Sequence, residues 1–122
     1  MREKSLAFAV CITEIHTYLC EEEKECILSR HLLRAGTEIG MNVAEAFYAP
    51  TRREFTAKMM AALNDAAETR YWLRLLECAK LLKEDRADCL LRECRELERM
   101  LATAVNTNRI KLQLASTIYQ LQ

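Results

Sequence analysis

The stretch that decides the fold is Leu32-Leu-Arg-Ala-Gly36-Thr-Glu-Ile-Gly40-Met-Asn-Val-Ala-Glu-Ala46, which reads as one continuous helix. It holds both glycines of the 122-residue chain, four residues apart. A glycine inside a helix costs about 1 kcal/mol relative to alanine, so two in one helix need a structural reason. Their spacing puts Gly36 and Gly40 on one helix face. We expect this face to allow close approach of another backbone, within the monomer or between subunits. The alternative is a locally weakened helix with no special contact.

Apolar periodicity divides the chain into four helices, over about 5–20, 24–48, 51–83 and from about 85 to 108. The only proline, Pro50, separates the second helix from the third. Thr51-Arg-Arg-Glu54 has the spacing of a capping box at the start of the third. We expect the second and third helices to be the longest, and Asn106-Thr-Asn108 to end the fourth.

Short connections between long helices predict an all-α, up-down-up-down four-helix bundle over residues 1–108. Residues 109–122 form a C-terminal helical or flexible tail, with apolar residues at helical spacing. This tail either makes a short fifth helix or extends the fourth.

Charge and cysteine content bound the setting of the protein. Eighteen basic residues match eighteen acidic ones, so net charge gives no help to non-specific nucleic-acid binding. No run of about 18 apolar residues would span a membrane, and no signal peptide stands at the start. None of the six cysteines forms a C-x-x-C pair. We interpret them as reduced thiols of a cytoplasmic protein, with a disulfide framework as the weaker alternative.

Two runs of the chain resemble a known family. The run 32–46 is similar to the second-helix signature of the small four-helix bundle proteins encoded in intervening sequences of bacterial 23S ribosomal RNA genes. The run Ala62-Leu-Asn-Asp-Ala-Ala-Glu-Thr-Arg-Tyr-Trp-Leu-Arg-Leu-Leu76 is similar to their third-helix signature, and the resemblance extends from Lys4 to about Ala104.

The resemblance implies the bundle fold, no catalytic activity, no cofactor, and ring-like homo-oligomers, often pentamers. A related branch is the accessory variability determinant of diversity-generating retroelements. That protein works with a reverse transcriptase and binds nucleic acid through a basic surface. RNA, DNA or a reverse transcriptase is therefore an expected partner, alongside further copies of the chain.

Local clusters of basic residues are the candidate nucleic-acid contacts. Three of them crowd the start of the third helix, where the helix dipole adds positive potential. The alternative is a solvated helix surface, balanced by Glu38, Glu54 and Glu77 at helical spacing. The candidates are Arg30, Arg34, Arg52, Arg53, Lys58, Arg70 and Arg74.

Adjacent aromatic residues point to a second surface. Tyr71 and Trp72 cannot face the same way, so one of them faces out of the monomer core or into a subunit contact. The expected packing and assembly residues are Gly36, Gly40, Asn42, Tyr71 and Trp72.

The sequence carries no recognisable catalytic or metal-binding motif. His16 and Cys20 lie four apart, but the chain lacks the paired short spacings of structural zinc sites. Glu45 and Glu68 lack the Glu-x-x-His spacing of di-iron bundles and are interpreted as salt-bridge residues. We therefore expect no enzyme and no metal. Two function classes stand: an RNA- or DNA-associated accessory protein, and an oligomeric adaptor that binds a protein partner.

Overall fold

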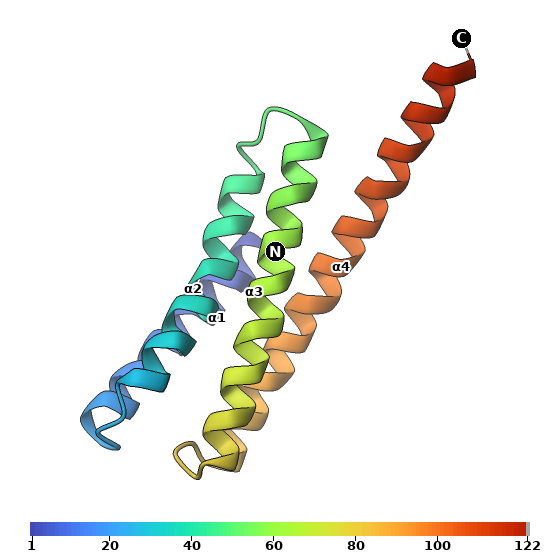
Figure 1. The fold of residues 1–122 in the computed structure, drawn as a ribbon. Coiled ribbons are helices and arrows are strands. Elements are labelled where there is room, and N and C mark those ends of the chain that lie inside the picture. The colour runs from blue at the N-terminus through green and yellow to red at the C-terminus, as the bar shows by residue number, and fades with distance from the viewer. Residues whose placement is uncertain (122) are drawn as a thin grey trace.

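The computed structural model describes residues 1–121 as four helices: α1 (Arg2–Glu21), α2 (Ile27–Ala46), α3 (Arg52–Cys78) and α4 (Glu84–Leu121). Short connections make successive helices antiparallel (Figure 1). Each helix packs on the next in sequence, and α4 also contacts α1. The described residues contain no strand. The predicted all-α, up-down-up-down four-helix bundle is confirmed.

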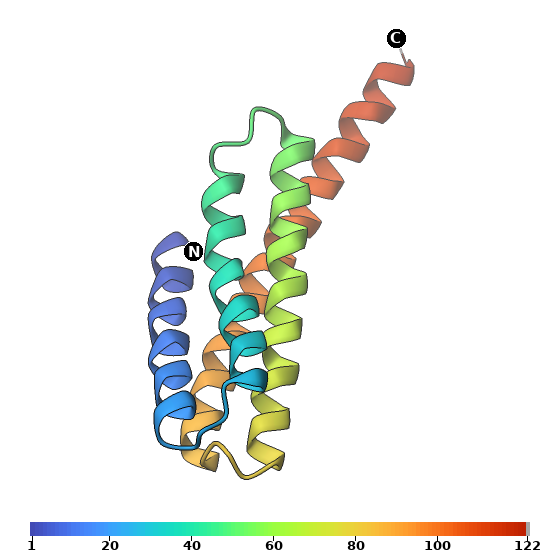
Figure 2. The ribbon, with the colours of Figure 1, turned by 60° about the vertical axis from the view of Figure 1, so that its left-hand side comes forward.

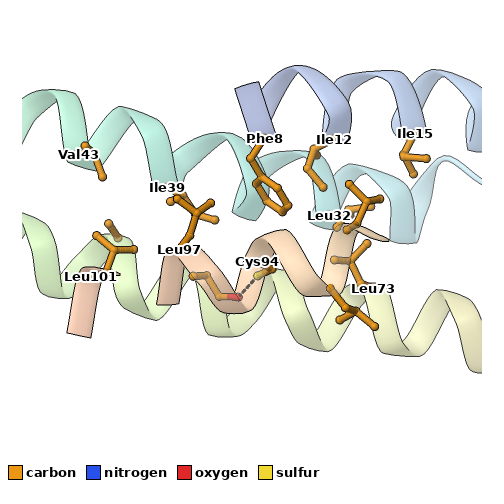
Figure 3. Packing of buried hydrophobic residues seen from close by; sticks show 14 of the residues in the cluster. Phe8, Ile12, Ile15, Leu32, Ile39, Val43, Leu73, Cys94, Leu97 and Leu101 are labelled. Atoms are coloured by element: carbon orange, nitrogen blue, oxygen red, sulfur yellow. Dashed lines mark hydrogen bonds between the residues drawn. The ribbon is translucent and has the colours of Figure 1, made fainter. Parts of the chain in front are cut away.

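One apolar stripe from each helix forms the core (Figure 3). Ile12 of α1, Ile39 of α2 and Leu73 of α3 are fully buried in it. The Cys94 thiol of α4 donates a hydrogen bond to the Ala66 carbonyl at 3.2 Å, and burial raises the pKa of Cys94 to about 12. Cys94 is therefore a neutral core residue.

The helix boundaries follow local chemistry. The Thr51 hydroxyl accepts a hydrogen bond from the Glu54 backbone N–H at 3.1 Å, so the predicted cap of α3 is confirmed. Helix α2 begins three residues later and ends two earlier than predicted, and α3 ends at Cys78 rather than near residue 83. Two of the three connections contain a lysine with positive φ: Lys24 at 56° and Lys80 at 64°.

Helix α4 corrects two expectations. It has 38 residues against 27 in α3 and 20 in α2, so the prediction that the second and third helices are longest was wrong. It also passes unbroken through Asn106-Thr-Asn108, which was expected to end it. The Asn108 amide donates to the Ala104 carbonyl at 2.7 Å and accepts from Arg52 of α3 at 3.0 Å. Because these bonds satisfy the amide, the asparagine does not terminate the helix.

The predicted tail therefore extends the fourth helix. Val105 is the last buried residue of α4, and we call residues 106–121 the α4 overhang. The overhang projects away from the bundle at the end where α2 and α3 are joined (Figures 1 and 2). None of the described helices, the overhang included, is apolar enough over sufficient length to cross a membrane.

Candidate functional site

The two glycines lie at the contact between α2 and α1. A Cβ atom built on Gly36 would lie 2.9 Å from the side chain of Ile12. A Cβ atom on Gly40 would lie 3.4 Å from the Ser5 carbonyl oxygen. These distances place both glycines at a close approach of two helices within the monomer.

Asn42 links α2 to α3 through a carboxyl group. Its amide donates to Asp65 at 2.7 Å. Partial burial raises the pKa of Asp65 to about 6, with Glu38 and Glu68 adding to the rise, while the bond from Asn42 opposes it. Asn42 therefore joins two helices and holds a carboxyl group whose pKa is raised to about 6.

The two adjacent aromatic residues face different ways, as expected. Trp72 is half-buried and stacks on His31 of α2, with ring centroids 4.9 Å apart. Its indole N–H is buried and has no hydrogen-bond partner within residues 1–121. Tyr71 is 61% exposed and turns its ring edge toward Trp72. Trp72 thus packs between α2 and α3, and Tyr71 faces out of the monomer.

Ion pairs neutralise four of the seven candidate basic residues along the sides of the bundle. These pairs are exposed, so each contributes little to stability, roughly 0–1 kcal/mol. They place a carboxylate next to each cation, where it competes with phosphate. The pairs are Arg34 with Glu68 at 2.9 Å and Glu38 at 3.3 Å, Lys58 with Glu45 at 2.6 Å, Arg70 with Glu98 at 3.2 Å, and Arg74 with Glu77 at 3.3 Å.

The remaining candidates separate into two places. Arg30 is exposed near the start of α2, at the opposite end of the bundle from the start of α3 (Figure 1). Arg52 and Arg53 lie at that start, and the bond from Arg52 to Asn108 holds it against α4. This contact brings the next residue of α4, Arg109, to the same end of the molecule.

We define the basic end as residues 1–3, 47–54 and 108–121. It carries five basic side chains and two acidic ones. One of the five, Arg2, lies over the Phe47 ring at 4.5 Å. No Asp or Glu follows Glu98 in the chain, so the charged side chains of the overhang are both basic. The five basic residues are Arg2, Arg52, Arg53, Arg109 and Lys111.

We define the acidic end as residues 21–25 and 80–88, the connections at the opposite end of the bundle (Figure 1). It carries seven acidic side chains and four basic ones. The formally neutral chain is therefore polarised along the bundle axis.

A disulfide closes the α1–α2 connection. Cys20 pairs with Cys26, with Cα atoms 4.8 Å apart, so the expectation of six reduced thiols was wrong for this pair. A tight turn brings the two residues into the usual range of Cα separations for a disulfide. Cys11, Cys78, Cys89 and Cys94 are free.

The pair of His16 and Cys20 singled out in the sequence is in contact. The Cys20 sulfur lies 3.7 Å from His16 Nε2, and His16 Nδ1 lies 2.7 Å from the Ser29 hydroxyl. The sulfur is engaged in the disulfide rather than free as a thiolate ligand. Across residues 1–121, no three His, Cys, Asp or Glu side chains gather in a group suited to a metal ion.

Comparison with known proteins gives the family. A family model described as 23S rRNA-intervening sequence protein matches residues 1–103. The chain belongs to this family. The resemblance drawn from residues 32–46 and 62–76 is thereby confirmed.

A solved structure shares the fold of this family member. It is a protein of unknown function from the S23 ribosomal protein family of Bacteroides thetaiotaomicron VPI-5482. The two are 36% identical, with a TM-score of 0.84, over 85% of this chain and 96% of that chain. No curated protein matches the chain.

The basic residues of the overhang lie beyond the family match. Arg109 and Lys111 were not among the predicted contacts, because residues 109–122 were assigned to a tail outside the bundle. The absence of any acidic residue after Glu98 is the sequence signal that would have identified them.

Proposed function

We propose that the protein is a non-catalytic, self-associating accessory protein of the ribosomal RNA intervening-sequence type that binds RNA or DNA with its basic end. The observation that carries this proposal is the separation of charge between the two ends of the bundle. Family membership supplies the link to ribosomal RNA.

The neutral total does not oppose this function, because the two ends are far apart. Helix α3 runs from one end to the other over 27 residues, about 40 Å at 1.5 Å per residue. The Debye length at physiological salt is about 8 Å. A phosphate at the basic end therefore meets the field of Arg52, Arg53 and the overhang, while the distant carboxylates are screened.

Self-association would multiply a weak contact. Each copy offers only a few unpaired cations, which supports modest affinity for a polyanion. A homo-oligomer, such as the pentameric ring that the resemblance implies, would present several basic ends to one nucleic acid and raise the avidity. A reverse transcriptase is a candidate protein partner, because the resemblance extends to the accessory variability determinant of diversity-generating retroelements.

Charge reversal tests the proposal. Binding of a labelled single-stranded RNA is measured by fluorescence anisotropy at low salt. We expect Arg52→Glu with Arg53→Glu, and separately Arg109→Glu with Lys111→Glu, to weaken binding at least tenfold. The matched control reverses two exposed arginines of α4 that lie between the two ends of the bundle, Arg92→Glu with Arg95→Glu, and is expected to have a smaller effect.

Circular dichroism of each variant checks that the bundle is intact, since Arg52 also bonds to Asn108. No binding by the wild type at low salt, or equal weakening by all three variants, would reject the basic end as the contact.

A second candidate function is an adaptor that binds a protein partner. It is favoured by large apolar side chains exposed on the surface of the molecule. Among them are Tyr48 at 85% exposed and Tyr119 of the overhang at 80%. The same RNA titration separates the two, because a wild type that does not bind RNA at low salt leaves the adaptor in first place.

A further inference from the structure

One face of α4 changes character where the bundle ends. Residues spaced three and four apart on this face are polar alongside the bundle and aliphatic on the overhang. The four aliphatic side chains are each 56–81% exposed. The polar members are Arg92, Glu96, Arg99, Thr103 and Thr107, and the aliphatic members, which we call the overhang stripe, are Ile110, Leu114, Ile118 and Leu121.

An aliphatic stripe on a fully solvated helix is unfavourable, because its apolar surface remains in contact with water. The overhang stripe is thus the kind of amphipathic helix face that docks into a hydrophobic groove. Nothing within residues 1–121 covers it, because the overhang leaves the bundle (Figure 2).

A groove of matching chemistry lies on the outer side of the α1–α2 pair. Gly40 and the small residues Ala9 and Ala44 line it, together with Arg2 and Thr37. Leu6 and Met41 flank it and are 66% and 59% exposed. The hollow of about 320 Å³ exists because the glycine contact draws α1 and α2 together and leaves no side chain at residue 40. We call it the α1–α2 groove.

The overhang cannot fill the groove of its own chain. It continues the axis of α4 past the end of the bundle (Figures 1 and 2). The groove is instead lined by residues of α1 and α2. The two apolar surfaces can therefore meet only between molecules. We propose that the overhang stripe of one copy docks into the α1–α2 groove of a second copy, a surface that rests on the self-association in the proposed function.

The buried area is sufficient if every copy gives one overhang and receives one. Four aliphatic side chains at roughly 100 Å² each supply about 400 Å² per overhang. If the groove loses an equal area on docking, the total is about 800 Å² per copy, which is what one partner contributes to a standard stable complex. A single overhang in a single groove buries only half of that.

The mass in solution tests the docking. Sedimentation velocity is run on the wild type, an overhang variant (Leu114→Glu with Ile118→Glu) and a groove variant (Leu6→Glu with Met41→Glu). We expect a wild type heavier than the 14.1 kDa monomer, and both variants at the monomer mass. The matched control places the same charges on the polar side of the overhang, Gln113→Glu with Gln120→Glu, and should keep the wild-type mass.

Mixing the two variants identifies the pairing directly. The groove variant keeps an intact overhang stripe and the overhang variant keeps an intact groove, so each pair in an equimolar mixture can form one overhang–groove contact. This contact buries half the area available to the wild type, so we expect a weak complex of twice the monomer mass, present at high protein concentration in the mixture and in neither variant alone. No complex in the mixture overturns the proposal. So does a groove variant that keeps the wild-type mass while the overhang variant loses it, because the overhangs would then pair with each other.

The outcomes separate this proposal from the proposed function. An oligomeric wild type whose overhang variant keeps its mass rejects the docking and leaves self-association standing. A monomeric wild type rejects both. RNA binding is judged independently by the Arg52→Glu with Arg53→Glu variant, which leaves the overhang stripe and the groove unchanged.

Discussion

At Gly36 and Gly40 the α1–α2 contact leaves different amounts of room for a methyl group. The added Cβ atom at residue 36 would overlap the buried, branched side chain of Ile12, which cannot turn away. At residue 40 it would reach the Ser5 carbonyl at close to ordinary contact distance. We expect Gly36→Ala to destabilise the fold by about 1–3 kcal/mol, because overpacking outweighs the gain in helix propensity.

Gly40→Ala is the matched control, since it adds the same group one turn away. We expect it to leave stability unchanged or raise it by up to about 1 kcal/mol through helix propensity. Urea unfolding of both variants measures the difference. Equal destabilisation by the two would contradict the distinction drawn from the contact distances.

Asp65 makes the free energy of unfolding depend on pH. Its folded-state pKa of about 6 lies above the value near 3.9 of an unfolded chain, chiefly because of burial. The folded state therefore takes up a proton as the pH falls from about 6 to 4. This contribution favours folding at the low-pH end and is lost as the pH rises through 6.

Asp65→Asn tests that sign. The variant keeps an acceptor for Asn42 and removes the cost of burying a charge. We expect a gain of about 1 kcal/mol at pH 7.5, modest because solvent screens the partly exposed carboxyl, and little change at pH 4.5. Thermal melts at the two pH values measure it, and an equal shift at both would show that titration of Asp65 is not the cause.

At the scale of helices, the number and order of the four helices were predicted correctly from the sequence, but only some of their ends were. Pro50 and the Thr51 cap identified the boundary between α2 and α3, because each has a specific local chemistry. The end of α3 was missed because the turn uses Lys80 with positive φ, where a glycine would have been the visible signal. The continuation of α4 past Asn108 was one of two alternatives left open, because the bond between Arg52 and Asn108 is a tertiary contact.

The candidate site divides in the same way. The glycine contact could be predicted because helical spacing alone fixes which residues share a face. The neutralisation of Arg34 by Glu68 could not, because those two residues lie 34 positions apart on different helices. The charge polarity is visible in the sequence only after the topology brings residues 1–3, 47–54 and 108–121 to one end.

The overhang adds length to α4 and little to the stability of the bundle. Of residues 106–121, none is buried, and Val105 is the last core residue of the helix. A chain ending at residue 108 keeps Asn108 and its bond with Arg52. We expect its melting temperature at dilute concentration to lie within about 2 °C of the full chain, a difference well under 1 kcal/mol. A loss of 10 °C or more would show that the overhang belongs to the folding unit.

At the scale of the whole molecule, the neutral chain has one positively charged end and one negatively charged end. The relevant length is the Debye length, about 8–10 Å, against a bundle of about 40 Å. Net charge therefore predicts neither attraction nor repulsion for a partner that touches one end only. The same polarity gives the protein an orientation on a polyanion, with the acidic connections directed away from it.

The salt dependence of RNA binding tests this polarity quantitatively. If Arg52, Arg53, Arg109 and Lys111 each contact one phosphate of a single strand, log K should fall with log salt at a slope of about −3 per copy. Arg109→Glu with Lys111→Glu removes two of the contacts and should bring the slope to about −1.5. Removing two charges from the acidic end, Glu21→Gln with Glu22→Gln, should leave the slope unchanged, because those carboxylates lie several Debye lengths away. A slope that responds equally to changes at both ends would mean that RNA follows the side of the bundle, where Arg34, Lys58, Arg70 and Arg74 would have to leave their carboxylate partners to bind it.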